Sequence, residues 1–165
     1  MKIAVVYESL TGNTAQLADV ICGEIPENAL IFRGAPGELP EADLYIVGSW
    51  TDKGQTSKGI MEFLSKLKNV KIAYFATVGF GGSEAYYETI HSRVLAAVDE
   101  SNTVVGKFYC QGKMPASVRA RYAAMAEKEP ENPQWPQMLE NFDAALTHPD
   151  GEDLRGIRKW IHTIL

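Results

Sequence analysis

The stretch that decides the fold is residues 3–25, IAVVYESLTGNTAQLADVICGEI, in which a strand, a short turn and a helix follow one another directly. Residues 3–7 are an uninterrupted apolar run, which is typical of a strand covered on both faces. Residues 13–25 carry apolar side chains at helical spacing, with Leu17 and Ile21 on one face. A strand followed at once by an amphipathic helix predicts the first βα unit of an α/β protein.

The same alternation continues through the first two thirds of the chain. Further strands are expected at 29–32, 44–48, 71–76 and 103–110, and further helices at 58–67 and 84–98. Ser83 is placed to cap the second of these helices. The βαβα order predicts a parallel sheet with helices on both faces and right-handed crossovers.

The last third breaks this pattern. We expect helices at 114–129 and 137–146, separated by a proline-rich break, and a final helix capped by Asp150. Residues 111–148 are therefore interpreted as a helical insertion after the fifth strand. Because 165 residues is the usual length of one domain and no repeat or low-complexity segment appears, we expect a single domain over residues 1–165.

The composition is that of an ordinary globular protein. Hydrophobic residues make up 45% of the chain, and 16 basic against 21 acidic residues give a net charge of −5. An acidic chain without a basic patch argues against nucleic-acid binding. The two cysteines, Cys22 and Cys110, exclude a disulfide framework or a cysteine-rich metal site. Because no apolar run is long enough to span a membrane and no signal-peptide pattern is present, we expect a cytoplasmic protein that does not bind membranes.

The loop after the first strand lies where open parallel sheets bind their ligands. It contains three hydroxyls, from Ser9, Thr11 and Thr14, together with Gly12 and Asn13. Unpaired amides at the start of the following helix, the helix dipole and these neutral donors together suit a phosphate. The loop has no Lys or Arg, and it lacks the spacing of a nucleoside triphosphatase P-loop or of a dinucleotide fingerprint. The alternative interpretation is an ordinary strand–turn–helix corner with a Thr or Asn cap.

Residues 9–14, SLTGNT, resemble the phosphate loop of the flavodoxins, (Ser/Thr)-x-Thr-Gly-x-Thr, in the same setting between a strand and a helix. Residues 50–54, 110–113 and 148–153 extend the resemblance over essentially the whole chain, which is similar to a flavodoxin-domain family common in anaerobic bacteria. Flavodoxins are the standard example of a doubly wound sheet with FMN at the switch point, so the resemblance implies that α/β fold, with three layers and five parallel strands in the order 2-1-3-4-5. The 5′-phosphate of FMN would lie against Ser9, Leu10, Thr11, Gly12, Asn13 and Thr14.

A flavin ring needs aromatic walls and backbone groups along its edge. Trp50 directly follows the third predicted strand, where flavodoxins commonly carry a stacking aromatic, and Gly54 would permit a backbone flip that brings a carbonyl to the reduced ring. Tyr86 is the expected second wall, with Tyr87 or Phe80 as alternatives, although the preceding loop lacks the aspartate of the Gly-Asp-Ser-Ser-Tyr segment of flavodoxins. The ring-binding residues that the resemblance implies are Trp50, Thr51, Asp52, Lys53, Gly54, Thr77, Val78, Gly79 and Tyr86.

Other reactive side chains give no second site. His91, His148 and His162 are scattered without metal-ligand spacing, and we expect surface or capping roles for them. Cys110 is interpreted as a buried structural thiol, and Lys113 as a solvated side chain near the mouth of the cleft. No metal site and no catalytic residue is therefore predicted.

These residues predict an FMN-binding redox protein that carries electrons at low potential to or from a partner oxidoreductase docked at the flavin edge. A phosphate loop without basic residues predicts a low potential for the second electron, and an acidic rim would steer a basic partner to the cleft. Because no side chain looks like a general base or a nucleophile, an electron shuttle is favoured over a self-contained oxidoreductase. An FMN-dependent reductase of a small substrate and a cofactor-free binding module are the open alternatives.

A phosphoacceptor receiver domain shares this topology and is a further alternative. Asp52, Thr77, Lys113 and Glu8 match its functional residues loosely. A second acidic residue near the first strand is missing, and Asp52 comes too late after the third strand. The sequence therefore favours the flavodoxin interpretation.

Overall fold

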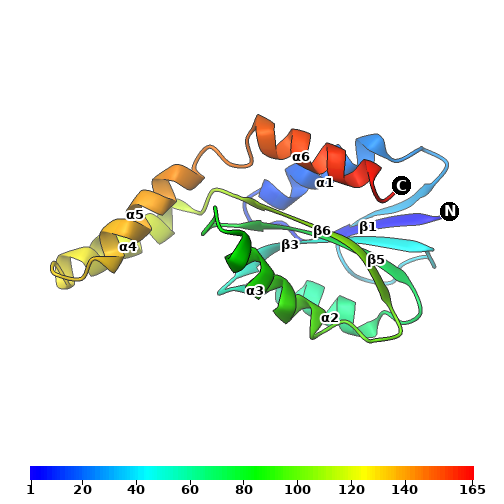
Figure 1. Cartoon of the computed structure of the whole chain (residues 1–165), viewed down its shortest axis with the longest axis horizontal. Coiled ribbons are helices and arrows are strands. Elements are labelled where there is room, and N and C mark those ends of the chain that lie inside the picture. The colour runs from blue at the N-terminus through cyan, green and yellow to red at the C-terminus, as the bar shows by residue number, and fades with distance from the viewer.

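The structure, a computed structural model, describes residues 1–165. Its centre is a sheet of five parallel strands in the order β2-β1-β3-β5-β6 (Figure 1). The strands are β1 (Ile3–Tyr7), β2 (Leu30–Gly34), β3 (Leu44–Asp52), β5 (Lys71–Val78) and β6 (Thr103–Gln111). Because β4 (Gln55–Thr56) is a two-residue strand paired antiparallel to the end of β3, the five parallel strands keep the predicted order.

Helices cover both faces of this sheet. α1 (Asn13–Glu24) and α6 (Gly151–His162) lie on one face, and α2 (Lys58–Lys66) and α3 (Glu84–Leu95) lie on the other (Figure 1). Each helix begins where a preceding strand or loop ends at the carboxyl edge, as the βαβα order predicts. The three-layer α/β arrangement is confirmed.

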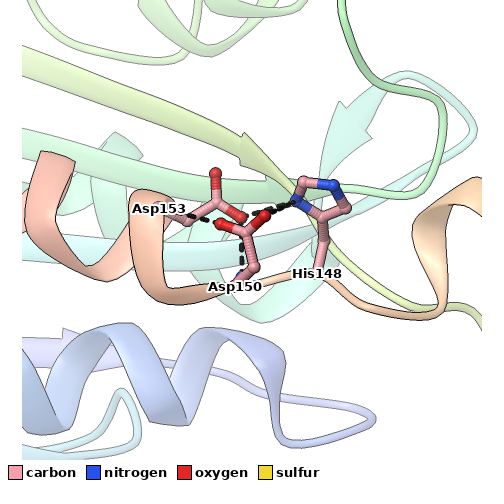
Figure 2. A group of neighbouring side chains, drawn as sticks. All are labelled: His148, Asp150 and Asp153. Atoms are coloured by element: carbon pink, nitrogen blue, oxygen red, sulfur yellow. Dashed lines mark hydrogen bonds and ion pairs between the residues drawn. The ribbon is translucent and has the colours of Figure 1, made fainter.

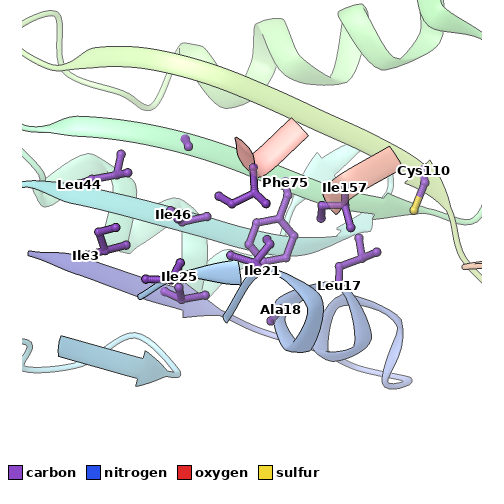
Figure 3. Close-up of a cluster of buried hydrophobic side chains, with 13 residues drawn as sticks. Ile3, Leu17, Ala18, Ile21, Ile25, Leu44, Ile46, Phe75, Cys110 and Ile157 are labelled. Carbon is purple, nitrogen blue, oxygen red and sulfur yellow. The ribbon is translucent and has the colours of Figure 1, made fainter. Parts of the chain in front are cut away.

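The central strand β1 is apolar throughout because its successive side chains face opposite layers. Ile3 and Val5 join the core cluster that α1 and α6 cover, whereas Ala4 and Val6 join the cluster that α2 and α3 cover. Figure 3 shows the first cluster, in which Ile157 of α6 meets α1 and the sheet. Each buried aliphatic side chain contributes about 1.5–3 kcal/mol, so these two cores hold the edge loops in place.

The insertion forms a helical hairpin that projects beyond the carboxyl ends of the strands (Figure 1). It consists of α4 (Ala116–Lys128) and α5 (Gln134–Ala145), which are joined by a short loop. Its base is closed by a backbone hydrogen bond of 2.9 Å from the Lys113 amide to the His148 carbonyl. α4 buries no residue, so the hairpin stands largely outside the two cores.

Several element boundaries differ from the predicted ones by a few residues, and two of these differences have a clear physical cause. β3 runs on to Asp52, so Trp50 belongs to the strand, where it pairs with Thr77 of β5, and not to a loop after it. The extension persists because β4 folds back and pairs with it. α5 begins at Gln134 and includes Pro136 in its first turn, where the missing proline N–H leaves no helical hydrogen bond unmade.

Candidate functional site

The loop between β1 and α1 presents a run of unpaired backbone donors. The amides of residues 9–14 donate to no protein acceptor, and the next amide, of Ala15, donates to the Ser9 hydroxyl at 3.1 Å. Gly12 stands at the start of α1 with φ of 91°, a left-handed conformation that a side chain would strain. Unpaired amides at the positive end of a helix dipole form an anion site.

The polar side chains of this loop mostly brace it instead of facing solvent. The Thr14 hydroxyl is fully buried and lies 3.1 Å from the Thr77 hydroxyl on β5. The Asn13 amide donates to the Lys113 carbonyl at 2.8 Å, and the Thr11 hydroxyl reaches the same carbonyl at 3.5 Å. The loop is therefore held against the carboxyl ends of β5 and β6, and its backbone supplies most of the free donors.

A second chain of hydrogen bonds joins this loop to the segment that carries Trp50. The Ser57 hydroxyl donates to the Glu8 carboxylate at 2.5 Å, and the Ser57 amide donates to the Ser49 hydroxyl at 2.9 Å. The Ser49 hydroxyl in turn donates to the Trp50 carbonyl at 2.6 Å. Sequence reasoning missed this network because Glu8, Ser49 and Ser57 lie outside the motifs that carry the flavodoxin resemblance.

Two adjoining cavities at the carboxyl edge of the sheet form one cleft. One has a volume of about 440 Å³ and extends from Thr11 past Trp50 to α4, and the other has about 350 Å³ and lies between Gly54 and Tyr86. The two share residues, and the shared lining residues are Thr51, Lys53, Gly79, Met114 and Tyr122. Of the predicted site residues, Ser9, Gly12 and Thr14 line neither cavity, and all the others line at least one.

A further hollow lies at the opposite edge of the sheet. It has a volume of about 620 Å³ and is lined in part by Asp43, Lys71 and Thr103, at the amino ends of the strands. Doubly wound sheets bind their ligands outside the carboxyl ends of the strands. The carboxyl-edge cleft is therefore the candidate site.

Aromatic side chains from the segment around α3 line one end of the cleft. Tyr86 and Phe80 meet edge to face with ring centres 6.1 Å apart, beside Gly54. Tyr87 instead stacks on Tyr109 of β6 at 5.5 Å and accepts a hydrogen bond from the Gly82 amide, so it packs on the sheet. Tyr86 and Phe80 therefore stay candidates for the second aromatic wall of a flavin site, whereas Tyr87 does not.

The hairpin adds lining residues that the sequence did not indicate. Tyr122 and Met114 line both cavities, and Tyr122 packs against Trp135 of α5 with ring centres 6.3 Å apart. An ion pair between Arg119 and Asp143, at 2.9 Å, fastens the two helices to each other. No local signal could have found Tyr122, because its place depends on how the hairpin leaves β6.

The charge of the cleft corrects the expectation of an acidic rim. Its lining includes the basic residues Lys53, Arg93, Lys113 and Arg121, and Asp52 is its one acidic residue. The phosphate loop itself has no basic residue, but β6 and the hairpin bring cations beside it. A positive cleft in a chain of net charge −5 removes the basis for expecting a low potential and a basic partner.

The cluster of His148, Asp150 and Asp153 lies where the hairpin meets α6 (Figure 2). The His148 Nδ1 atom is 2.6 Å from the Asp153 carboxylate and 3.8 Å from that of Asp150. Both carboxylates also form the capping box of α6, which confirms the predicted cap and lowers the pKa of Asp150 through backbone hydrogen bonds. Helix capping therefore accounts for the cluster.

Two other predicted roles have contrasting outcomes. Cys110 is buried, and burial raises the pKa of its thiol, as expected for a structural cysteine. The surface role predicted for His91 is wrong: the ring is buried, its Nδ1 lies 3.0 Å from the Tyr109 hydroxyl, and burial lowers its pKa. An inward-facing histidine on α3 looks like a polar residue in the sequence, so only packing reveals it.

Comparisons with known proteins agree with this architecture. The family model described as flavodoxin domain matches residues 4–162. The flavodoxin-like domain-containing protein BilS of Clostridium symbiosum (strain WAL-14163) is 38% identical over 181 aligned residues, covering 98% of this chain and 94% of that protein. Oxidised flavodoxin 1 from Bacillus cereus has a TM-score of 0.59 at 16% identity and covers 99% of this chain and 96% of its own. A flavoprotein from Lactobacillus acidophilus NCFM, solved in complex with FMN, has a TM-score of 0.51 at 18% identity, with 66% of this chain and 92% of its own covered.

The fold is that of a doubly wound α/β protein with its main cleft at the switch point of the sheet. The chain belongs to the flavodoxin family, because the flavodoxin-domain model matches residues 4–162 and a flavodoxin-like relative is 38% identical over nearly its whole length. None of its helices has the length and apolar character that a membrane crossing requires.

Proposed function

We propose that this chain binds FMN in the carboxyl-edge cleft and exchanges electrons with a partner oxidoreductase. The observation that carries the proposal is the run of unpaired amides at residues 9–14, which opens into a cleft lined by Trp50, Tyr86 and Tyr122. The family match and the flavodoxin neighbours, one of them an FMN complex, support FMN as the cofactor. When bound, FMN supplies the capacity to take up and release electrons.

The side chains of the cleft fit the two ends of such a ligand. The amides of residues 9–14, with Lys113 and Arg121 nearby, suit the phosphate dianion. Trp50 and Tyr86 offer flat apolar surfaces for the ring. The Thr51 hydroxyl is buried without a hydrogen-bond partner and belongs to a residue that lines both cavities, so a polar ligand edge would satisfy it.

Electron exchange suits the cleft better than acid–base chemistry. The lining contains no His and no Cys, and its one carboxylate, Asp52, is exposed to water. Leu10 and Phe80 are 62% and 47% exposed beside the cleft, which is typical of a surface that another protein covers. Because four of the five charged residues that line the cleft are basic, we expect an acidic docking face on the partner.

Titration of the purified protein with FMN and with riboflavin, followed by flavin fluorescence, tests the cofactor. We expect FMN to bind more tightly than riboflavin, because only FMN has a phosphate for the amides of residues 9–14. Equal affinity would contradict the phosphate site, and no uptake of either would favour a cofactor-free binding module.

Anaerobic reduction of the FMN-loaded protein tests the reaction. We expect slow reduction by NADH or NADPH alone and rapid exchange with a one-electron carrier protein, because the cleft has no His or Cys and its one carboxylate, Asp52, is exposed to water. Rapid reduction by a nicotinamide nucleotide, coupled to turnover of a small acceptor, would instead identify a self-contained reductase.

A further inference from the structure

A two-residue turn links β3 to β4 at the end of the cleft that Tyr86 lines. Thr51 pairs with Thr56 and Asp52 with Gln55, which leaves Lys53 and Gly54 as the turn. Both have positive φ, 50° for Lys53 and 75° for Gly54, as a type I′ hairpin turn requires. A lysine is rarely found in this conformation, so something outside the turn must stabilise it.

Arg93 of α3 supplies that support. Its Nη1 atom donates a hydrogen bond of 2.9 Å to the Gly54 carbonyl, across 39 positions of sequence. The guanidinium also lies against the glycine itself, because a Cβ atom at Gly54 would come within 2.5 Å of Nη1. The backbone at Gly54 is buried, so this carbonyl has Arg93 as its partner in place of water.

The charge of Arg93 is not neutralised by any carboxylate. None of the protein's ion pairs includes it, whereas Arg33, Arg119 and Arg158 each pair with a carboxylate. Arg93 lines the same 350 Å³ cavity as Gly54 and Tyr86. One side chain therefore occupies the backbone acceptor of the turn and places a positive charge at the aromatic end of the cleft.

We propose that Arg93 is a positioning residue that sets the two one-electron potentials of the cofactor site, an inference that rests on the proposed FMN function. The first electron, supplied by a one-electron donor, arrives with a proton from water and gives the ring a new N–H donor. The second electron arrives alone and leaves one negative charge. Because Arg93 already binds the Gly54 carbonyl, this acceptor would be less available to the new N–H, which would lower the first potential. The charge of Arg93 would favour the added negative charge and so would raise the second potential.

Arg93→Met separates this role from ordinary packing. In a dithionite titration of the FMN-loaded variant we expect the first potential to rise and the second to fall. The ratio of the two equilibrium constants should grow at least tenfold, a change of 59 mV in their separation for one-electron steps. Shifts in the same direction, or an unchanged separation in a folded and FMN-loaded variant, would overturn the proposal.

Two further variants serve as controls. Arg155→Met removes the same charge from α6, on the opposite face of the sheet, and should leave both potentials unchanged. Arg93→Lys keeps the charge without the forked guanidinium and should leave the second potential at its original value. A fall in the second potential with Arg93→Lys as large as with Arg93→Met would show that charge is not the cause and would overturn the proposal.

Trypsin provides a test that needs no cofactor. Cleavage after Lys53 requires the turn to open, so the cofactor-free Arg93→Met protein should be cut there several-fold faster than the unmodified chain. The substitution removes the site at Arg93 itself, and cleavage at the remaining sites should be unchanged. An unchanged rate at Lys53 would show that Arg93 does not hold the turn. If the turn loosens as expected but the chain takes up no FMN, the proposed function fails while the contact itself stands.

Discussion

Two regions of the molecule line the cleft in different ways. The sheet edge contributes residues 9–14 and 50–54, which follow or end strands of the sheet. The helical hairpin between β6 and α6 contributes Arg121 and Tyr122. Hydrogen bonds to Thr77 and Arg93 brace the two segments of the sheet edge, and Ser57 binds Glu8, directly before the first of them. The hairpin helix α4 buries no residue and faces the cleft from outside the core.

This difference has a physical consequence. Groups held by buried hydrogen bonds are preorganised, so little conformational entropy is lost when a ligand binds them. Side chains on a projecting hairpin keep more freedom and must lose it on binding. We therefore expect the sheet edge to supply most of the FMN affinity and the hairpin to adjust it.

Among the substitutions that test this difference between the sheet edge and the hairpin, replacement of Trp50 should weaken FMN binding most. Trp50→Ala is expected to weaken FMN binding by about 1–3 kcal/mol, because a flat aromatic wall is lost. Fluorescence titration measures the change, with Trp135→Ala in the hairpin as the matched control that should lose less. An unchanged affinity would mean that Trp50 does not contact the ring.

Thr11→Ala tests the other end of the sheet edge. We expect FMN binding to weaken by about 1 kcal/mol, since one hydrogen bond to the phosphate is lost, and riboflavin binding to stay nearly constant. Parallel titrations with the two flavins measure the difference. Equal losses for both would show that residues 9–14 do not hold the phosphate.

Tyr122→Ala tests the hairpin as a wall of the cleft. A loss of about 0.5–1 kcal/mol is expected, and it should be the same for FMN and riboflavin because Tyr122 offers an aromatic face and no phosphate donor. A loss larger than that of Trp50→Ala would reverse the proposed ranking of the two regions.

Arg121→Met tests the hairpin charge. The expected loss is about 0.2–1 kcal/mol for FMN at low salt, because Arg121 is exposed, and the effect should fade as salt is added. Titrations at two ionic strengths measure it, with Arg155→Met as the control for charge alone. A loss that persists at high salt would indicate a direct, desolvated contact.

Replacement of His91 should have the smallest effect, a change in how the stability of the fold depends on pH. Burial, and next the nearby Lys107, lowers its pKa against a weaker opposing influence of Glu88, so the unfolded chain binds a proton more readily than the folded one. Stability is then full above about pH 6.5, the value for unfolded histidine, and declines as the pH falls below it. Denaturant unfolding of His91→Gln should show a shallower decline over this window, and an unchanged slope would assign the decline to other groups.

The local units of the fold were predictable because each depends on residues near one another in the sequence. The apolar run at 3–7, the spacing of Leu17 and Ile21, and the Asp150 cap all gave elements that the structure contains. The strand order 2-1-3-4-5 followed from the flavodoxin resemblance. The length of β3 did not, because its last residues depend on pairing with β4.

The sequence by itself determined the βαβα order, the donor-rich first loop and the nature of the ligand that such a loop suits. Only the tertiary structure decided that α4 lines the cleft, that basic side chains gather there and that Arg93 holds the Gly54 carbonyl. Periodicity and turn chemistry act over a few residues, whereas these contacts join segments tens of residues apart. Their geometry is set by how whole elements pack, which no local pattern records.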